Sequence, residues 1–328
     1  MNSRRLTLVI NPISGTHSKR EVAAQVERRL GKCGYEVRVE YTNGPGDATR
    51  IAREAAERGD YGVLACGGDG TVNEVAAGLV GSSTALGIIP AGSGNGLARH
   101  INIPIDIERS IKVIAEDCVV DCDYGVVNDK PFFCTFGVGF DAAVSHRFSL
   151  KHRRGLSTYI ASAIDEFIQY HPQRYCIKAG DTVITDKAFL VAVCNASQYG
   201  NNAFIAPAAS IRDGLLDVTI VFEGNIFSKA LSGFELIAGA IGNHGKVRTF
   251  RVSELSIERE EPTITHIDGE PTELPCNLHI KCVPGQLKVF ATRHKPRFRP
   301  FITPIVLFAK DWWIVISRFF SCIFKKKS

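Results

Sequence analysis

The sequence lacks the cysteine and histidine spacings that hold metal ions. Its ten cysteines are scattered without a Cys-x-x-Cys pair, and its nine histidines show neither His-x-x-His nor His-x-x-x-His spacing. Scattered thiols are typical of a reducing compartment, and zinc sites use ligands at short, regular spacing. We therefore expect reduced thiols in a cytoplasmic protein and no zinc site.

Targeting segments and long apolar runs are also missing. Residues 1–5 lead directly into an apolar strand, without the hydrophobic stretch and cleavage site of a signal peptide. No uninterrupted apolar stretch reaches the roughly 18 to 20 residues that span a bilayer. The chain has no P-loop, and no Gly-x-Gly-x-x-Gly follows its first expected strand, which excludes two common nucleotide-binding motifs.

Positive charge is concentrated at one end of the chain. The net charge is +5, but residues 293–328 contain nine basic side chains and one aspartate, which gives +8 there and leaves −3 for the rest. A mildly acidic body argues against nucleic-acid binding by the whole surface. A basic tail favours attraction to an anionic surface such as a membrane.

The hydrophobic pattern divides the chain into three parts. Up to residue 125, expected strands alternate with helices, which predicts an α/β domain with a doubly wound parallel sheet. Residues 126–292 contain closely spaced apolar runs separated by turns, which predicts a β-rich, sandwich-like domain interrupted by helices at 157–170 and 228–241. Residues 293–328 form a basic, apolar tail.

Glycine-rich segments follow three of the expected strands. They are residues 11–15 (Asn-Pro-Ile-Ser-Gly), 67–74 (Gly-Gly-Asp-Gly-Thr-Val-Asn-Glu) and 90–95 (Pro-Ala-Gly-Ser-Gly-Asn). In a parallel sheet all three lie at the carboxyl edge, where bare N–H groups and a helix N-terminus attract phosphate. Asp69 would repel a phosphate unless a metal ion lay between them. The pattern indicates a nucleotide site with a divalent cation.

These motifs together resemble the diacylglycerol kinase catalytic family, which includes bacterial lipid kinases, sphingosine kinases and ceramide kinases. The resemblance extends to about residue 292 and includes 137–142 (Gly-Val-Gly-Phe-Asp-Ala), 213–217 (Asp-Gly-Leu-Leu-Asp) and 268–270 (Asp-Gly-Glu). It implies an α/β nucleotide domain, a β-rich domain and an active site between them. Residues 92–98 (Gly-Ser-Gly-Asn-Gly-Leu-Ala) look more like the sphingosine and ceramide branch, so diacylglycerol, a sphingoid base, ceramide and a polyprenol all remain possible acceptors.

The resemblance implies a set of nucleotide-binding residues, most of them in the three loops. Thr42 matches only by its position at the end of the second strand. The set is Asn11, Ser14, Gly15, Thr42, Gly67, Gly68, Asp69, Gly70, Thr71, Val72, Asn73, Glu74, Gly92, Ser93 and Asn95.

Acidic residues in the second half supply the expected chemistry. A lipid hydroxyl is a weak nucleophile, and a positioned carboxylate can take its proton as the O–P bond forms. The resemblance implies that Glu270 is this base with Asp268 beside it, although the sequence leaves the choice between them open. Asp69 would hold Mg²⁺ or orient the acceptor hydroxyl. Read without the family, residues 268–270 are a solvated turn.

A second cation site is implied at Asp213. In related bacterial kinases the matching segment binds a structural Mg²⁺, which here would use Asp213 and the backbone oxygens of Ser210 and Leu215. Carboxylate and carbonyl oxygens are the ligands that such a hard ion prefers. The alternative is an ordinary turn that leads into a strand.

The tail has the composition of an interfacial helix. Residues 301–324 are rich in Phe, Ile, Val and Trp, and on a helix Lys310, Arg318 and Lys325 would share one narrow polar face. We expect a C-terminal amphipathic helix on the membrane surface. A helix folded onto the body and a tilted spanning anchor are the alternatives.

The sequence as a whole predicts an ATP-dependent, Mg²⁺-requiring lipid kinase on the cytoplasmic face of a membrane, with no nucleic-acid partner. An NAD kinase-like enzyme, which shares the Gly-Gly-Asp-Gly-Thr loop, is the nearest alternative. A catalytically inactive nucleotide or lipid sensor is another. The oligomeric state cannot be predicted from these features.

Overall fold

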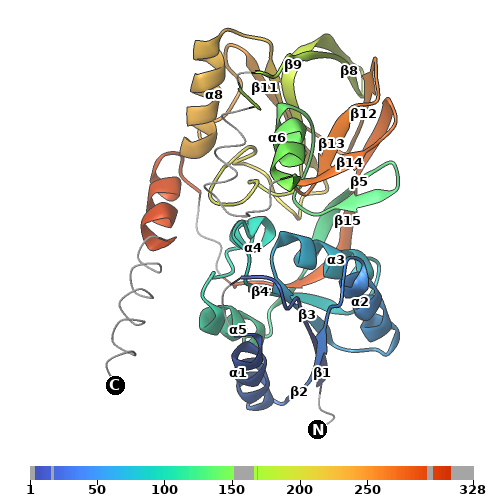
Figure 1. Ribbon diagram of the computed structural model, residues 1–328, viewed down its shortest axis with the longest axis vertical. Coiled ribbons are helices and arrows are strands. Elements are labelled where there is room, and N and C mark those ends of the chain that lie inside the picture. Colours follow the sequence, from blue (N-terminus) through green and yellow to red (C-terminus); the bar gives the residue numbers. More distant parts are fainter. Residues whose placement is uncertain (1–3, 16–17, 151–165, 168, 294–297, 312–328) are drawn as a thin grey trace.

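The chain forms two lobes joined by long strands, as a computed structural model shows (Figure 1). The structure describes all residues except 1–3, 16–17, 151–165, 168, 294–297 and 312–328. The first lobe is a parallel-sheet α/β domain and the second is a β-rich, mainly antiparallel domain, so the expected fold class is confirmed. Of the predicted helix at 157–170, residues 157–165 and 168 lie outside the described residues, and residues 166, 167 and 169 are helical.

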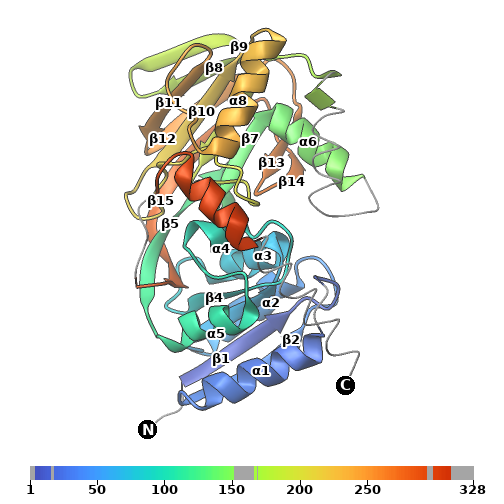
Figure 2. The same cartoon turned by 90° about the vertical axis from the view of Figure 1, so that its left-hand side faces the viewer.

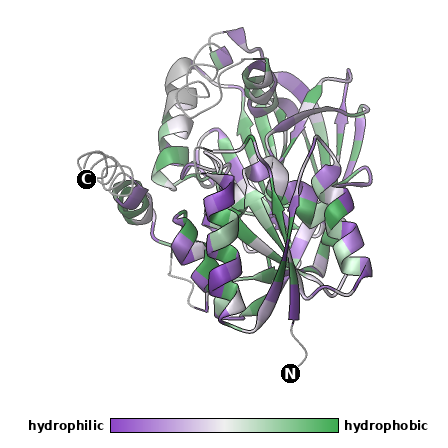
Figure 3. Cartoon of the chain, turned by 60° about the horizontal axis from the view of Figure 1, so that its bottom comes forward, coloured by the Kyte–Doolittle hydropathy of each residue, from purple (hydrophilic) through white to green (hydrophobic). Residues whose placement is uncertain are grey.

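The first lobe contains a four-stranded parallel sheet in the order β4-β3-β1-β2. Figure 3 looks onto this lobe and shows the sheet between two layers of helices. The elements are β1 (Arg4–Ile10), α1 (Lys19–Gly31), β2 (Tyr35–Tyr41), α2 (Asp47–Glu57), β3 (Gly62–Gly67), α3 (Asp69–Leu79), β4 (Ala85–Pro90), α4 (Gly96–His100) and α5 (Ile107–Ala115).

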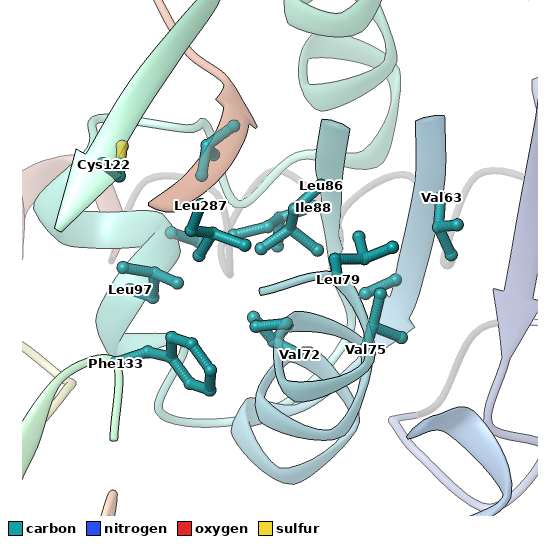
Figure 4. Close-up of a cluster of buried hydrophobic side chains, with 14 of the residues drawn as sticks. Val63, Val72, Val75, Leu79, Leu86, Ile88, Leu97, Cys122, Phe133 and Leu287 are labelled. Carbon is teal, nitrogen blue, oxygen red and sulfur yellow. The ribbon is translucent and has the colours of Figure 1, made fainter. Parts of the chain in front are cut away.

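Alternating side chains of the strands explain why both faces are covered. On β3, Leu64 belongs to the core beneath α1 and α5, while Val63 and Ala65 belong to the core beneath α2 and α3. Successive residues of a strand point to opposite faces, so an entirely apolar strand needs helices on both sides. Figure 4 shows the second of these cores, where Val72, Val75 and Leu79 of α3 meet the sheet.

The second lobe is mainly antiparallel. Its elements are β5 (Val119–Val127), β6 (Lys130–Phe132), β7 (Thr135–Gly139), α6 (Phe140–Ser149), β8 (Gln173–Ala179), β9 (Thr182–Cys194), β10 (Leu216–Phe222), α8 (Ile226–Ala238), β11 (Val247–Val252), β12 (Glu254–Arg259), β13 (Ile264–Ile267), β14 (Glu270–Glu273) and β15 (Asn277–Phe290).

Two strands connect the lobes. β15 runs antiparallel to β5 along most of its length and pairs with β4 of the first lobe where Val289 lies opposite Leu86. Cys122 of β5 and Leu287 of β15 are buried in the same core as α3 (Figure 4). The lobes therefore share both a sheet and a hydrophobic core. The division of the chain at residues 125 and 292 stays a prediction.

A C-terminal helix is present, as expected, and is described over residues 302–311. It lies at the edge of the molecule near α8 (Figures 1 and 2). No helix within the described part of the chain is long and apolar enough to cross a membrane. Of the predicted polar stripe, Lys310 is described and exposed, whereas Arg318 and Lys325 lie outside the described residues.

Candidate active site

The three glycine-rich loops meet at the carboxyl edge of the parallel sheet. The Asn11 N–H donates to the Cys66 carbonyl at 3.1 Å, and the Ala91 N–H donates to the Gly67 carbonyl at 2.8 Å. α1 and α3 cover opposite faces, so the winding of the sheet reverses between β1 and β3. Such a reversal opens a crevice that commonly binds ligands.

The second and third loops touch through their backbones. A Cβ added to Gly92 would lie 2.4 Å from the Gly68 Cα, a distance that no side chain can occupy. A Cβ on Gly15, whose φ is +61°, would lie 2.2 Å from the Ala91 carbonyl oxygen. Only glycine permits this approach. The loops therefore form one continuous surface, with Ser93 exposed on it.

Two asparagines shape these loops with their side chains. Asn11 donates from Nδ2 to Thr71 Oγ1 at 3.2 Å, which connects the first loop to the second. Asn95 closes its own turn, because its Nδ2 donates to the Gly92 carbonyl at 2.8 Å and its Oδ1 accepts from the Gly92 N–H at 3.2 Å. Ser14 Oγ donates to the Asn11 carbonyl at 2.9 Å. These predicted site residues therefore lie together.

Asp69 connects the second loop to the third. Its Oδ2 accepts from the Asn95 N–H at 2.8 Å, and its Oδ1 accepts from the Gly96 N–H at 2.6 Å. Burial raises the pKa of Asp69, and the two backbone hydrogen bonds oppose that shift. Each carboxylate oxygen can accept a further contact, so the group fits a role as one ligand of a nucleotide-bound Mg²⁺.

Three of the predicted nucleotide contacts direct their side chains into the protein. Val72 is 5% exposed and packs in the core beneath α3 (Figure 4). Thr42 is buried, and its N–H donates to the Ile10 carbonyl. Glu74 Oε2 accepts from the Ala48 N–H at 3.1 Å, at the N-terminus of α2. Asn73 is half-buried on α3.

Glu270 brings the second lobe to these loops. It begins β14 and is exposed, and a Cβ added to Gly70 would lie 2.8 Å from its Oε1. The turn before it is tight, with φ of +51° at Asp268 and +83° at Gly269. One carboxylate of the second lobe therefore faces the loop that opens α3.

Asp268 points the other way. Its Oδ1 accepts from the N–H groups of Cys134 and Thr135 at 2.7 and 2.8 Å, and its Oδ2 accepts from the Phe133 N–H at 2.8 Å. Burial raises the pKa of Asp268 to about 6, although the three hydrogen bonds lower it. The carboxylate ties the 268–270 turn to the start of β7, so the two acids have different surroundings.

Comparisons with known proteins match this architecture. Residues 5–127 match the diacylglycerol kinase catalytic domain, and residues 134–291 match the YegS C-terminal NAD kinase beta sandwich-like domain. A probable lipid kinase YegS-like protein of Chromohalobacter salexigens is 31% identical, over 79% of this chain and 85% of that protein. The chain belongs to the diacylglycerol kinase family of lipid kinases.

Other relatives of the chain agree with this family. The diacylglycerol kinase of Bacillus subtilis strain 168 is 27% identical, over 81% of this chain and 90% of that enzyme. The crystal structure of a putative diacylglycerol kinase from Bacillus anthracis superposes with a TM-score of 0.75 at 23% identity, covering 89% of this chain and 99% of that one. The structural likeness concerns the fold, and the expected family is confirmed.

The second lobe also contains a buried network next to the 268–270 turn that sequence reasoning missed. His266, 1% exposed, accepts from the Gly269 N–H at its Nδ1 and donates from Nε2 to Asp141 Oδ2 at 3.1 Å. Tyr199 donates its hydroxyl to the same oxygen at 2.8 Å. A Cβ on Gly137 would lie 2.3 Å from both Asp141 Oδ2 and His266 Nε2. Gly137 and Asp141 of the 137–142 motif are therefore the part of the sequence that could have indicated this network.

The Asp213 segment is a hydrogen-bonded turn. Asp213 Oδ1 accepts from the Leu215 N–H at 3.2 Å, and its Oδ2 lies 3.7 Å from the Arg251 guanidinium. Asp123, which the sequence did not identify, accepts from the Gly214 N–H at 2.7 Å. Among the described residues there is no group of three or more His, Cys, Asp or Glu side chains placed to hold a metal ion. Carboxylate and carbonyl oxygens are the type of ligand that Mg²⁺ prefers, whereas the Arg251 guanidinium places a positive charge beside Asp213.

A cavity of about 660 Å³ lies in the second lobe beside α6 and the first residue of β13. Its lining is partly apolar, and the Arg147–Glu166 ion pair of 2.9 Å lies in its wall. The apolar part consists of Ala143, Leu150, Tyr170, Pro262 and Ile264.

Proposed function

We propose that this protein is an ATP-dependent, Mg²⁺-requiring kinase that phosphorylates the hydroxyl of a long-chain lipid. The observation that carries the proposal is the approach of Glu270 to Gly70. An acid from the second lobe faces the phosphate-binding loop of the first, so a hydroxyl between the lobes would reach both. Catalysis of phosphoryl transfer rests mainly on such positioning and on charge stabilisation.

In this mechanism the three loops bind the nucleotide phosphates with backbone N–H groups at the N-terminus of α3. Glu270 takes the proton of the lipid hydroxyl as the O–P bond forms and the bond to the leaving nucleotide breaks. Asp268, whose oxygens already accept three N–H groups, holds the turn and is a positioning residue. Mg²⁺, held in part by Asp69, would neutralise charge on the phosphates.

The acceptor lipid would reach the site through the second lobe. The cavity beside α6 borders β13, and the other end of this four-residue strand leads to the turn that carries Glu270. Its apolar walls suit a hydrocarbon chain. We further propose that residues 293–328 hold the enzyme at the cytoplasmic face of a membrane, and that Asp213 with the Ser210 and Leu215 carbonyls binds a structural Mg²⁺.

One assay tests the activity and its rivals. Purified full-length protein is incubated with labelled ATP, Mg²⁺ and vesicles that contain diacylglycerol, a sphingoid base, ceramide or a polyprenol, and NAD is offered in parallel. We expect one labelled lipid and no labelled NADP. Phosphorylated NAD would favour an NAD kinase-like enzyme. Nucleotide binding without any labelled product would favour a sensor.

A further inference from the structure

Exposed hydrophobic side chains are concentrated on one edge of the molecule. Among the described residues twelve large hydrophobic side chains are strongly exposed, and eight of them lie on α8, on the C-terminal helix or at residue 301 between them. Most proteins that act alone in water do not gather such residues. The eight are Leu231, Phe234, Ile237, Phe301, Ile302, Ile305, Val306 and Phe308, with exposed fractions of 44–68%.

Both helices expose most of their large apolar side chains, although each also packs one half-buried leucine, Leu236 or Leu307, on its inward side. On α8, Ser232 and Ala238 are buried, while Leu231, Phe234 and Ile237 are exposed. On the C-terminal helix the inward face follows the same helical spacing, with Pro304 buried and Leu307 and Asp311 half-buried. A surface helix of a globular protein usually exposes a polar face, whereas the outward faces of these two helices are apolar.

The two helices form one surface. The Phe301 N–H donates to the Ala238 carbonyl at 2.8 Å, so the segment that opens the C-terminal helix is bonded to the last turn of α8. The Phe298 ring packs against the Phe204 ring with centroids 4.9 Å apart, which holds the connecting segment against the body. In Figure 1 both helices lie on the left side of the molecule, and in Figure 2 that side faces the viewer.

The charges on this surface are arranged for an anionic partner. The acidic residues within 226–238 and 298–311 are Glu235 and Asp311, and each is paired. Glu235 Oε2 lies 2.8 Å from His244 Nε2, and Asp311 Oδ2 lies 2.7 Å from Arg99 NH1. The basic Arg299 and Lys310 are exposed. In sequence, residues 312–328 continue with aromatic residues and four basic ones and no acidic residue.

We propose that α8 and the C-terminal helix together form a docking surface for an anionic lipid bilayer. An amphipathic surface with basic residues at its border inserts its apolar side chains at the head-group boundary. The tail proposed above would then be one part of a larger surface whose other half is α8. This inference rests on the proposed function in one respect only, because the lipid substrate explains why the protein would bind a membrane. The surface itself is defined by its exposed apolar side chains and its charged residues.

The docking surface is fixed to the candidate active site. Arg99, which pairs with Asp311, also donates from Nε to the Gly94 carbonyl at 2.9 Å. Gly94 precedes Asn95, whose N–H binds Asp69. A bilayer bound to this surface would therefore lie at a defined position relative to the three glycine-rich loops.

The test is vesicle co-sedimentation of the full-length protein without ATP. Vesicles of phosphatidylcholine, with and without phosphatidylglycerol, are titrated against wild type, the double variant Phe234→Glu/Ile237→Glu and the control Val183→Glu. Val183 lies on β9, outside α8 and the C-terminal helix, and its 61% exposure matches the 60% and 66% of Phe234 and Ile237. We expect the double variant to lose about tenfold or more in affinity for the anionic vesicles, and the control to change by less than about twofold.

Several outcomes would overturn the inference. Equal vesicle binding by wild type and the double variant would do so, as would an equal loss in the Val183→Glu control. A wild-type dimer that the double variant converts to a monomer, with vesicle binding unchanged, would assign the surface to a second copy of the chain. Leu231→Ser is a milder variant that introduces no charge and is included in case the double variant misfolds. It should also weaken binding to the anionic vesicles.

The readout separates this inference from the proposed function. Binding is measured without turnover, so a wild type that binds through α8 and phosphorylates no lipid would retain the docking surface and refute the kinase. A double variant that binds vesicles normally would refute the docking surface, whatever lipid the enzyme phosphorylates.

Discussion

Glu270 approaches Gly70 so closely that a methyl group on Gly70 would lie 2.8 Å from the glutamate Oε1. The two residues come from different lobes, β14 and the first turn of α3. Because the lobes share strands β5 and β15, the fold holds the two lobes against each other, and the exposed Glu270 side chain completes the approach. It is the point at which an acid of the second lobe meets the loop that we propose binds phosphate.

The substitution Glu270→Gln should abolish most phosphoryl transfer while nucleotide binding persists. The amide keeps the size of the side chain and removes the proton acceptor, which typically costs about 10² to 10⁴ in kcat. Initial rates with labelled ATP and lipid, together with nucleotide affinity by calorimetry, measure the two properties separately.

Glu273→Gln is the matched control for that variant. Glu273 ends the same strand, β14, and is exposed, so the same change of charge occurs three residues from the proposed base. We expect wild-type rates from it. Unchanged turnover in Glu270→Gln, or equal losses in both variants, would refute the assignment of the base.

Gly92→Ala should weaken nucleotide binding by at least about tenfold. Its Cβ would lie 2.4 Å from the Gly68 Cα, and two backbones cannot both remain in place at that distance. Because the second and third loops must then separate, their N–H groups no longer point toward one common phosphate site. Gly31→Ala is the control, since nothing lies within 4 Å of its added Cβ. Equal nucleotide affinity for both variants and wild type would contradict this account of the loops.

The loops could be predicted from the sequence because their information is local. A buried strand, a glycine cluster and a helix follow one another within about twenty residues, as at Gly67 and Gly68, and parallel pairing places all such loops at one edge. The fold class could be predicted from the sequence for the same reason. The nearly continuous apolar runs of β1 and β3 require cover on both faces, whatever elements supply it.

Contacts between distant segments could not be predicted in this way. The different environments of Asp268 and Glu270 depend on the N–H groups of residues 133–135, which lie more than 130 positions earlier in the chain. The pairing of Arg99 with Asp311 spans 212 positions. Nothing in the local pattern of either partner identifies the other, because such pairs arise only once both lobes are assembled.

The stability contributed by Asp268 should depend on pH between about 4 and 6. Its pKa in the folded protein is about 6, above the ordinary value of 3.8, so the folded state holds the proton more tightly than the unfolded state. The contribution is therefore complete below about pH 4 and is lost as pH rises through 6. Urea unfolding of wild type and Asp268→Asn measures it.

We expect the wild-type free energy of unfolding, minus that of Asp268→Asn, to fall by up to roughly 3 kcal/mol across this range. Subtracting the variant removes the titration of all other groups. A difference that stays flat would mean that the three backbone hydrogen bonds outweigh burial and that Asp268 is already ionised near pH 4.

Mg²⁺ should raise the melting temperature of the protein through Asp213 if that residue binds a structural cation. A ligand that binds only the folded state stabilises it by mass action, so the melting temperature rises with Mg²⁺ concentration. Asp213→Asn removes the one carboxylate of the proposed set and should remove most of the rise. Asp181→Asn, an exposed aspartate in another turn before a strand, should keep it. A rise of equal size in all three proteins, measured without nucleotide, would leave Asp213 as a turn residue that pairs with Arg251.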